Sequence, residues 1–256
     1  MYKVSWKVFA ALLAGLIAIN QFYPVPGMIY AILSIAYITL VVIGVFNIQM
    51  NFFLKSYCRG SKEKKEIALS FDDGPNTQFT PQLLDILSEN NIIATFFCIG
   101  EKINKQNSPL NKIDDQGHFI GNHSFSHSVL FDFKLPSRML KEINATNESI
   151  YKAIGKKPRF FRPPFGITNS FLARALEKTN MISIGWSLRS LDTVKKHEKV
   201  LKRIKRKIHP GDIILLHDTS EKTLNVVREL ISWLKTNDYK IVGLDKLLAE
   251  EAYEAD

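Results

Sequence analysis

The residues best suited to chemistry are two adjacent carboxylates and two histidines some fifty residues further along the chain. The carboxylates are Asp72 and Asp73, within Ser-Phe-Asp-Asp-Gly-Pro at 70–75, and the histidines are His123 and His127. A catalytic zinc ion takes three protein ligands of histidine and carboxylate type and leaves one position open to water. Two histidines and Asp73 complete that set, and Asp72 is then free to act as a base on the water. The pattern predicts metal-assisted hydrolysis.

The aspartate pair must lie where a strand ends. Residues 66–71 are a short, mostly apolar stretch that soon meets Gly74-Pro75, which predicts a buried strand entering a turn. Neighbouring side chains of a regular strand point to opposite faces, so both carboxylates can share a site only where the chain is already turning. The alternative is an Asx-type turn that caps the following segment. The histidine pair favours the metal site.

The histidine pair has two interpretations. A spacing of four is typical of one side of a helical turn, as in zinc proteases, but those proteins carry a glutamate directly after the first histidine as the base. This chain has Ser124 there. A zinc protease is therefore disfavoured, and Asp72 is the expected base. The alternative is a pair of histidines at a helix start, with Ser124 and Ser126 as capping residues.

Three further segments complete the pattern, each at or after a predicted strand. Arg-Pro-Pro-Phe-Gly at 162–166 follows strand 159–161, and Trp-Ser-Leu-Arg-Ser-Leu-Asp-Thr at 186–193 follows strand 181–185. Ile-Leu-Leu-His-Asp at 214–218 lies at the end of strand 212–216. In order and spacing the five segments resemble the polysaccharide deacetylase family, also called the NodB-homology or carbohydrate esterase 4 group. The resemblance covers about residues 66–248. It implies a distorted (β/α) barrel that removes acetyl groups from amino sugars.

The resemblance implies roles for the matching residues, with the metal ligands being Asp73, His123 and His127. Asp72 is then the catalytic base, and Arg162 holds its carboxylate through a charge-assisted pair. The backbone N–H of Phe165 joins the zinc ion in stabilising the oxyanion. Leu215 lines a small pocket for the acetyl methyl group.

The resemblance also implies an acid. His217 is expected to protonate the departing amine, and Asp192 to keep that imidazole charged and oriented. This fits the reaction itself, because an amide has a weakly electrophilic carbonyl and a poor leaving group. Zinc addresses the first difficulty and a positioned acid the second.

The chain departs from the family pattern at three positions. The fourth segment commonly reads Asp-x-x-Asp-Trp, and Arg189 and Thr193 replace its first Asp and its Trp. Phe165 replaces a common Tyr but keeps the backbone donor. No metal ligand, base or acid is changed, so these departures concern the substrate rather than the reaction.

The N-terminal region differs from the rest of the chain in being strongly apolar. Residues 28–46 are apolar or small without one charge, long enough to cross a bilayer, and residues 5–23 form a second, marginal span. We expect a transmembrane helical hairpin; the alternative is a signal peptide, although no clear cleavage site follows the first apolar stretch. The predicted domain division is a membrane anchor at 1–54, a basic linker at 55–65 and a NodB-like deacetylase domain at 66–250.

Charge favours a cytoplasmic domain. Lysines and one arginine flank the two spans, and the loop between them is uncharged; the flanking residues are Lys3, Lys7, Lys55, Arg59, Lys62, Lys64 and Lys65. The positive-inside rule therefore places both ends on the cytoplasmic side of the cell (inner) membrane. Many relatives act on wall polysaccharide outside the cell, whereas a cytoplasmic domain suits a lipid-linked amino sugar. If the first apolar segment is instead cleaved off, or lies in the membrane interface without crossing, the domain faces the outside of the cell.

The net charge of +9 suits work near an anionic leaflet. Its densest patch, 195–207, carries an apolar stripe at helical spacing formed by Val200, Leu201, Ile204 and Ile208. A solvated helix face is the first interpretation and anionic lipid the second. No nucleic-acid partner is expected, since no binding motif accompanies the charge. The two cysteines, Cys58 and Cys98, imply no disulfide framework.

Apolar strands alternate with helix-like runs at 81–90, 136–154, 170–178 and 224–236. This alternation favours parallel βα units, with the chemistry at the carboxyl ends of the strands. The leading hypothesis is a membrane-anchored, metal-dependent N-deacetylase of glycans. Zinc is the expected metal, although such a site also accepts cobalt, nickel or iron. The alternatives are a deformylase of a lipid-linked formamido sugar and a catalytically idle glycan-binding protein.

Overall fold

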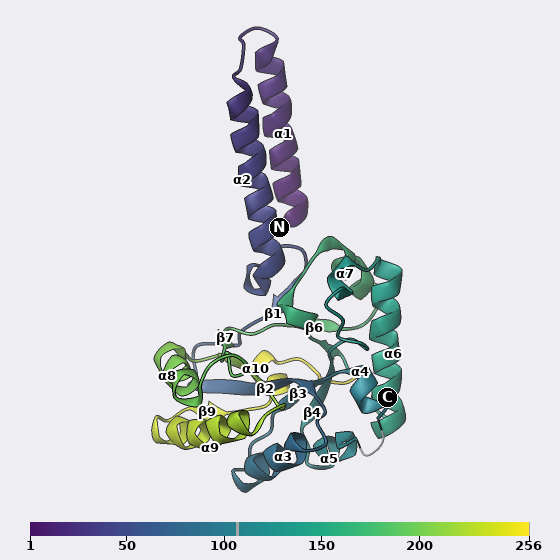
Figure 1. Ribbon diagram of the computed structural model, residues 1–256, viewed down its shortest axis with the longest axis vertical. Helices are drawn as coiled ribbons and strands as arrows, with labels where there is room; N and C mark the ends of the chain where they lie inside the picture. Colours follow the sequence, from purple (N-terminus) through teal and green to yellow (C-terminus); the bar gives the residue numbers. More distant parts are fainter. Residues whose placement is uncertain (106–107, 256) are drawn as a thin grey trace.

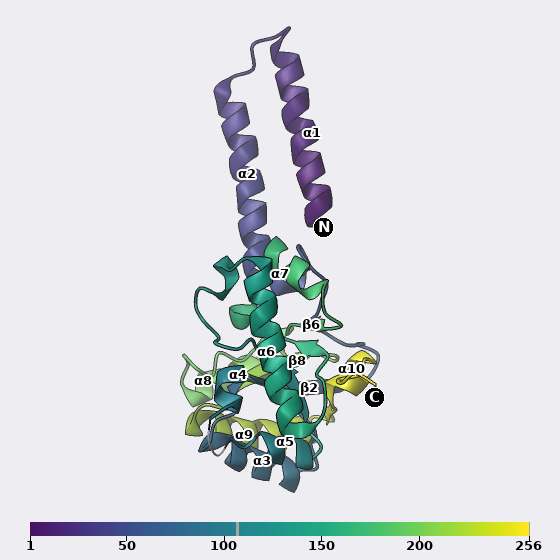
Figure 2. The same cartoon turned by 90° about the vertical axis from the view of Figure 1, so that its right-hand side faces the viewer.

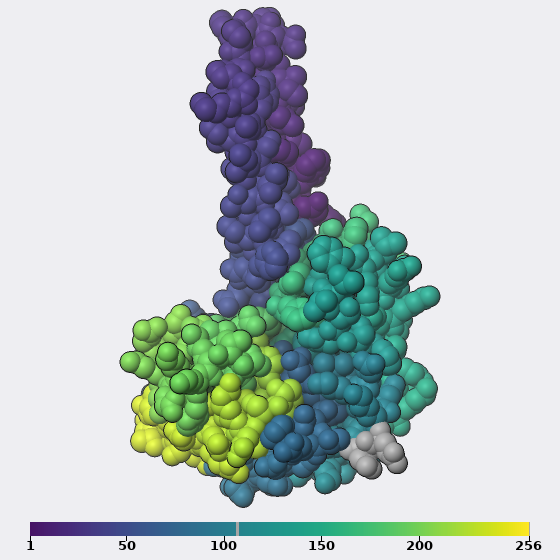
Figure 3. All heavy atoms as spheres, in the orientation of Figure 1, coloured from purple at the N-terminus to yellow at the C-terminus, as the bar shows by residue number. Residues whose placement is uncertain are grey.

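The chain folds into a helical hairpin joined to an α/β domain, in a computed structural model that describes residues 1–105 and 108–255 (Figure 1). The hairpin consists of α1 (Tyr2–Asn20) and α2 (Gly27–Phe46), which stand away from the domain (Figure 3). Both helices are long and apolar enough to cross a membrane, by length and composition. Compared with the expected spans 5–23 and 28–46, α1 begins and ends three residues earlier.

Both ends of the hairpin return to the domain. The N–H of Tyr2 donates to the C=O of Phe52 at 2.8 Å. Phe52 is 2% exposed and packs on Gly44 of α2, where a Cβ atom would lie 2.5 Å from the phenyl ring. Only glycine allows that approach, so the domain is held directly against the carboxyl end of α2.

The domain is built on one parallel sheet in the order β1-β6-β5-β4-β3-β2-β8-β7, with β9 pairing separately with β2. The strands are β1 (Ser56–Tyr57), β2 (Glu66–Gly74), β3 (Thr95–Cys98), β4 (Phe119–Asn122), β5 (Phe160–Phe161), β6 (Ile182–Ile184), β7 (Leu188–Arg189), β8 (Ile213–His217) and β9 (Lys240–Ile241). Every pairing between these strands is parallel. The predicted βα architecture is confirmed, as an incomplete barrel with β1 and β7 at its edges.

The connecting helices cover the outside of the sheet (Figure 1). They are α3 (Phe79–Glu89), α4 (Gly100–Ile103), α5 (Leu110–Asp115), α6 (Pro136–Ile154), α7 (Ser170–Leu176), α8 (His197–Lys207), α9 (Glu221–Thr236) and α10 (Leu244–Leu248), with 3-10 turns η1 (Ile48–Met50), η2 (Phe131–Phe133) and η3 (Pro164–Gly166). The range predicted for α6 is matched, and α9 begins three residues before its predicted start. Ser220 explains that difference, because its side chain caps the helix by accepting from the N–H of Thr223.

The core forms between the sheet and these helices. Its main cluster joins β2, β3 and β8 to α3 and α9. The apolar stripe predicted in the basic segment is buried against the same cluster, at Val200, Leu201, Ile204 and Ile208. Its lysines and arginines therefore occupy the outer face of α8. Cys58 and Cys98 are both free thiols, as predicted.

Candidate active site

The carboxyl end of β2 delivers both aspartates to one place. The pairing of β2 with β3 shifts register between Asp72 and Gly74, a bulge that leaves Asp73 without a partner on β3. Asp73 has a φ of 71° and so turns out of the strand alternation. Its carboxylate thereby joins that of Asp72, although the two residues are adjacent. The predicted need for a turning strand end is met by this bulge.

The two histidines lie on a loop after β4, not on a helix. His123 follows the strand directly, and both Ser124 and His127 have positive φ values, of 63° and 46°. The helical-turn interpretation and the capping interpretation of Ser124 and Ser126 are therefore wrong. The tight loop brings the two rings to 4.7 Å between centroids by another route.

Asp73, His123 and His127 form a set that fits one metal ion. Their ligand atoms all lie within 4.8 Å of one another. The Asp73 Oδ1 atom is 3.5 Å from His123 Nε2 and 3.3 Å from His127 Nε2. Two donors bound tetrahedrally to one zinc ion at about 2.0–2.1 Å would lie about 3.3–3.4 Å apart. The donor types and both spacings therefore suit zinc.

The protonation states of this set also suit a cation. The Nδ1 atom of His123 lies 2.8 Å from the C=O of Arg162, which fixes the tautomer that leaves Nε2 free. Burial lowers the pKa of His127 to about 4, so its ring is neutral at neutral pH. Burial alone raises the pKa of Asp73, but hydrogen bonding to His123 and the histidine charges outweigh it and hold that pKa below its ordinary value.

Asp72 is held by a buried arginine. Arg162 is 0% exposed, and its Nη1 donates to Asp72 Oδ1 at 2.7 Å. Its remaining donors bind Ser70 Oγ and the carbonyls of Ile184 and Gly185 at 2.9–3.2 Å. The other Asp72 oxygen, Oδ2, is 3.8 Å from His123 Nε2. Asp72 therefore lies next to the metal-ligand set with one oxygen directed towards it.

His217 reaches the same place from β8. Its Nε2 lies 3.9 Å from Asp73 Oδ2, while its Nδ1 lies 2.9 Å from Asp192 Oδ1. Burial lowers the pKa of His217, but the hydrogen bond and charge of Asp192 outweigh burial, so the pKa is raised overall. Asp192 also accepts from Ser190 Oγ and Thr223 Oγ1. The imidazolium form is thus stabilised, with Nε2 turned towards the metal-ligand set.

Phe165 and Leu215 border the same region. The Phe165 ring is 4.7 Å from that of His127, and the residue has a φ of 56°. Leu215 is 2% exposed and lies two residues before His217, on the same face of β8. All nine residues predicted for the site are therefore brought to one edge of the sheet.

Comparison with known proteins agrees with this geometry. A family model described as polysaccharide deacetylase matches residues 59–184. The peptidoglycan-N-acetylmuramic acid deacetylase PdaA of Bacillus subtilis is 30% identical over 79% of this chain and 80% of its own. A peptidoglycan-N-acetylglucosamine deacetylase of Bacillus cereus is 34% identical over 73% of this chain and 70% of its own. The chain belongs to the polysaccharide deacetylase family.

Solved structures of the family share the fold. The crystal structure of the Bc1960 peptidoglycan N-acetylglucosamine deacetylase superposes with a TM-score of 0.72 at 31% identity, covering 78% of this chain and 95% of that one. A Bacillus anthracis protein described as a carbohydrate esterase 4 pseudoenzyme superposes with a TM-score of 0.69 at 27% identity, covering 75% and 68%. Members of this deacetylase family can therefore keep the fold without activity.

Sequence reasoning missed the residues that hold the histidine loop of this family member. Asn122 is 0% exposed; its Oδ1 accepts from the N–H of Ser124, and its Nδ2 donates to Asn147 of α6 at 2.7 Å. Glu142, also on α6, accepts from the N–H and the hydroxyl of Ser126. No local pattern marks the contacts with α6, because their partners lie 16 and 25 residues apart in the chain. Asn122 alone had a signal, as the polar end of a buried strand beside His123.

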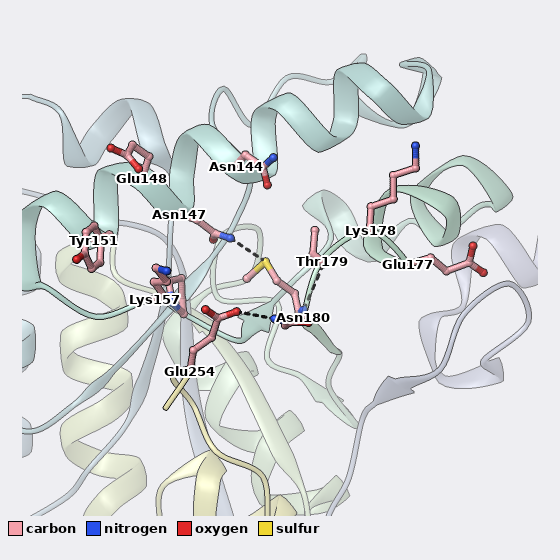
Figure 4. Close-up of a pocket in the computed structure, with 12 residues that line it drawn as sticks. Asn144, Asn147, Glu148, Tyr151, Lys157, Glu177, Lys178, Thr179, Asn180 and Glu254 are labelled. Carbon is pink, nitrogen blue, oxygen red and sulfur yellow. Dashed lines mark hydrogen bonds between the residues drawn. The ribbon is translucent and has the colours of Figure 1, made fainter. Parts of the chain in front are cut away.

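One surface hollow lies away from the candidate site. It has a volume of about 720 Å³ and is lined by α6, the segment that follows α7 and the C-terminal segment (Figure 4). Asn147 borders it, with its amide directed to the sulfur of Met181. None of the nine site residues lines this hollow. The hollow is therefore separate from the metal-ligand set.

Proposed function

We propose that this protein hydrolyses the N-acetyl group of amino sugars in a glycan, using one divalent metal ion, with zinc as the first choice. Asp73, His123 and His127 would hold the ion. The observation that carries the proposal is the convergence of this set with two differently supported groups, Asp72 beside Arg162 and His217 beside Asp192. Membership of the polysaccharide deacetylase family supports the same reaction.

Each residue has a separate proposed role in the hydrolysis. When bound, zinc supplies a Lewis acid that polarises the acetyl carbonyl and makes water more acidic. Asp72 takes the proton of the attacking water, and Arg162 holds its carboxylate in position through the buried ion pair. His217, protonated because of Asp192, donates from Nε2 to the departing amine nitrogen. The proposed base and the proposed acid thus each have a separate buried partner, Arg162 and Asp192.

Two more residues serve the acyl group. The backbone N–H of Phe165 is proposed to stabilise the developing oxyanion, since its ring already borders His127. Leu215 is proposed to contact the acetyl methyl, as a buried apolar side chain two residues before the acid. The replacements Arg189 and Thr193 leave both of these functions in place.

The hairpin is proposed to anchor the protein in the cell membrane. α1 and α2 expose apolar side chains along their length, which water does not favour and lipid does. The catalytic domain follows α2 directly, so its substrate is an N-acetylated glycan near the bilayer, either a wall polymer or a lipid-linked saccharide. The basic outer face of α8 is proposed as a second lipid contact, of electrostatic kind, ranked behind a simple solvated helix face.

Acetate release tests the activity. The full chain in detergent is stripped of metal with a chelator, resupplied with zinc, cobalt, nickel or iron, and given N-acetylated chitooligosaccharides or peptidoglycan fragments. Metal-dependent acetate release, absent in the matched Asp72→Asn protein, supports the proposal. Formate release from a formamido sugar would instead identify the deformylase.

The pseudoenzyme relative makes one other function worth testing, that of an idle protein binding glycan in the same cleft. Glycan binding measured by calorimetry, without acetate from any of these substrates or metals, would favour it. Retention of Asp72, Arg162, Asp192 and His217 argues against it, because binding alone requires no acid–base pair.

A further inference from the structure

Large apolar side chains stand exposed on the loop that leads into α6. Val129 is 75% exposed, Leu130 61%, Phe133 82% and Leu135 58%. Phe171, at the start of α7, is 37% exposed. We call these five residues the apolar rim. Soluble proteins rarely leave so much apolar surface uncovered in one region, and such surfaces mark contacts with proteins or membranes.

Hydrogen bonds connect the rim to the carboxyl end of α2. The N–H of Thr168 donates to the C=O of Val45 at 3.0 Å. The next residue, Asn169, donates its side-chain amide to the C=O of Asp132, in the middle of the rim loop, at 2.8 Å. Figure 2 shows this loop, before α6, at the top of the domain beside α2. The rim is therefore level with the end of the second candidate span.

The inner side of the rim loop is fixed to the domain. Phe131 is 0% exposed and belongs to a buried cluster with Leu172 and Leu176. Leu54, which follows the hairpin, packs against the same cluster. The rim side chains on either side of Phe131 are thus held outward by a packed core.

The rim loop is also low in free charge. Asp132 and Lys134 are the ionisable residues in 129–135, and Lys134 pairs with Glu142. Both carboxylate oxygens of Asp132 are buried, without a hydrogen-bond partner among the described residues. Burial raises the pKa of this carboxyl to about 7, which favours its neutral form. Such a loop carries less charge out of water than one whose carboxyl has an ordinary pKa, because protonation of Asp132 removes its charge.

We propose that the apolar rim inserts into the interfacial layer of the bilayer that α1 and α2 cross, as a third membrane contact. The inference rests on the proposed anchoring. Lipid is favoured over a protein partner because the rim continues the surface of the hairpin. α2 ends at Phe46, which is 69% exposed and follows Val45, the residue whose C=O accepts from Thr168. Thr168 is in turn adjacent to Asn169, which bonds to the rim loop. Aromatic and aliphatic side chains are those that enter an interface.

Rim insertion sets where the substrate lies. His127 is two residues before Val129, so their Cα atoms lie within about 7 Å. The metal-ligand set is then held at the membrane surface. The substrate class is a glycan whose amino sugar lies close to the bilayer, such as a lipid-linked saccharide or a polymer segment resting on the lipid headgroups.

Tryptophan quenching by lipids brominated near the headgroup end of the acyl chain tests the rim. The full chain is reconstituted in phosphatidylcholine liposomes, where the native Trp6 of α1 reports on anchoring. In a Trp6→Phe background, Phe133→Trp reports on the rim. Gln82→Trp, exposed on α3 at the far end of the domain, is the matched control (Figure 1). Trp186 and Trp233 contribute equally to both.

We expect quenching of Trp6, and a several-fold greater loss of emission in Phe133→Trp than in Gln82→Trp. Quenched Trp6 with no difference between the two variants would overturn the rim and leave the anchor intact. Blue-shifted, unquenched emission from Phe133→Trp would show a protein cover and also overturn it. If Trp6 is unquenched, the anchor fails and the rim proposal fails with it, while acetate release still decides the activity.

Discussion

Asp72 and His217 are register partners on the neighbouring parallel strands β2 and β8. Such strands lie about 4.8 Å apart, so the two side chains enter the site from adjacent backbone positions. Each has its own buried support: Arg162 lies 2.7 Å from Asp72, and Asp192 lies 2.9 Å from His217. A single strand pairing thus fixes the spacing between the proposed base and the proposed acid.

Asp72→Asn separates base chemistry from metal binding. It keeps the side-chain shape and an acceptor for Arg162, so we expect the metal content to stay near that of the parent. The kcat for acetate release should fall about 10²–10⁴-fold, the usual contribution of a general base. His123→Ala should lose metal and activity together. Mass-spectrometric metal content and acetate release, measured on one preparation, check both; an active Asp72→Asn protein would reject the assigned base.

Arg162→Leu tests the buried ion pair as a structural element. The change leaves Asp72 buried without its cation, and it removes the donors bound by the carbonyls of Ile184 and Gly185. Breaking a buried pair from one side costs about 3–5 kcal/mol of the free energy of unfolding. Arg138→Leu, on the exposed face of α6, is the control and should change it by less than about 0.5 kcal/mol. Denaturant unfolding in detergent measures both, and equal small losses would contradict the prediction.

Local sequence patterns predicted most of the strands and helices that carry the candidate site, whereas the family resemblance supplied most of its proposed members. The apolar run at 66–71 marked β2, and the rule that adjacent side chains diverge showed that Asp72 and Asp73 needed a turning strand end. The helical stripe in 195–207 correctly marked the buried face of α8. These features depend on neighbours in the chain, so periodicity and turn chemistry are enough to find them.

Long-range contacts explain what the sequence could not predict. A spacing of four between His123 and His127 suggested a helix, but the loop conformation depends on Asn122 and on Glu142, a side chain from α6. Likewise, the bulge that turns Asp73 depends on its pairing with β3. In each case a partner from another element, α6 or β3, takes part, and no local pattern predicts that partner.

Asp132→Asn should make stability less sensitive to pH. The folded pKa of Asp132 is about 7, whereas an unfolded aspartate has about 3.9. Between these values the unfolded chain binds fewer protons than the folded one, so parent stability falls as pH rises. The variant lacks this titration, and its melting temperature should exceed that of the parent more at about pH 8 than at about pH 4.5.

Thermal unfolding in detergent at the two pH values measures that difference. Asp85→Asn, exposed on α3, is the matched control and should shift both melting temperatures alike. If the melting temperature of Asp132→Asn exceeded that of the parent by more at the acidic pH than at the alkaline pH, the assigned burial of Asp132 would be contradicted.

The side of the membrane can be predicted from charge and tested on cells. The N–H of Tyr2 bonds to Phe52, so the N-terminus and the domain lie on the same side of any bilayer that the hairpin crosses. Lysines cluster at that side and the turn at 21–26 is uncharged. The positive-inside rule then places the domain in the cytoplasm.

We expect the domain to resist protease added to intact protoplasts and to be cleaved after permeabilisation. Phe22→Lys combined with Tyr23→Lys, at exposed positions of the turn, weakens the charge difference and should increase the cleaved fraction. Full cleavage of the parent in intact protoplasts would place the domain outside, next to the wall polymer rather than a cytoplasmic lipid-linked precursor.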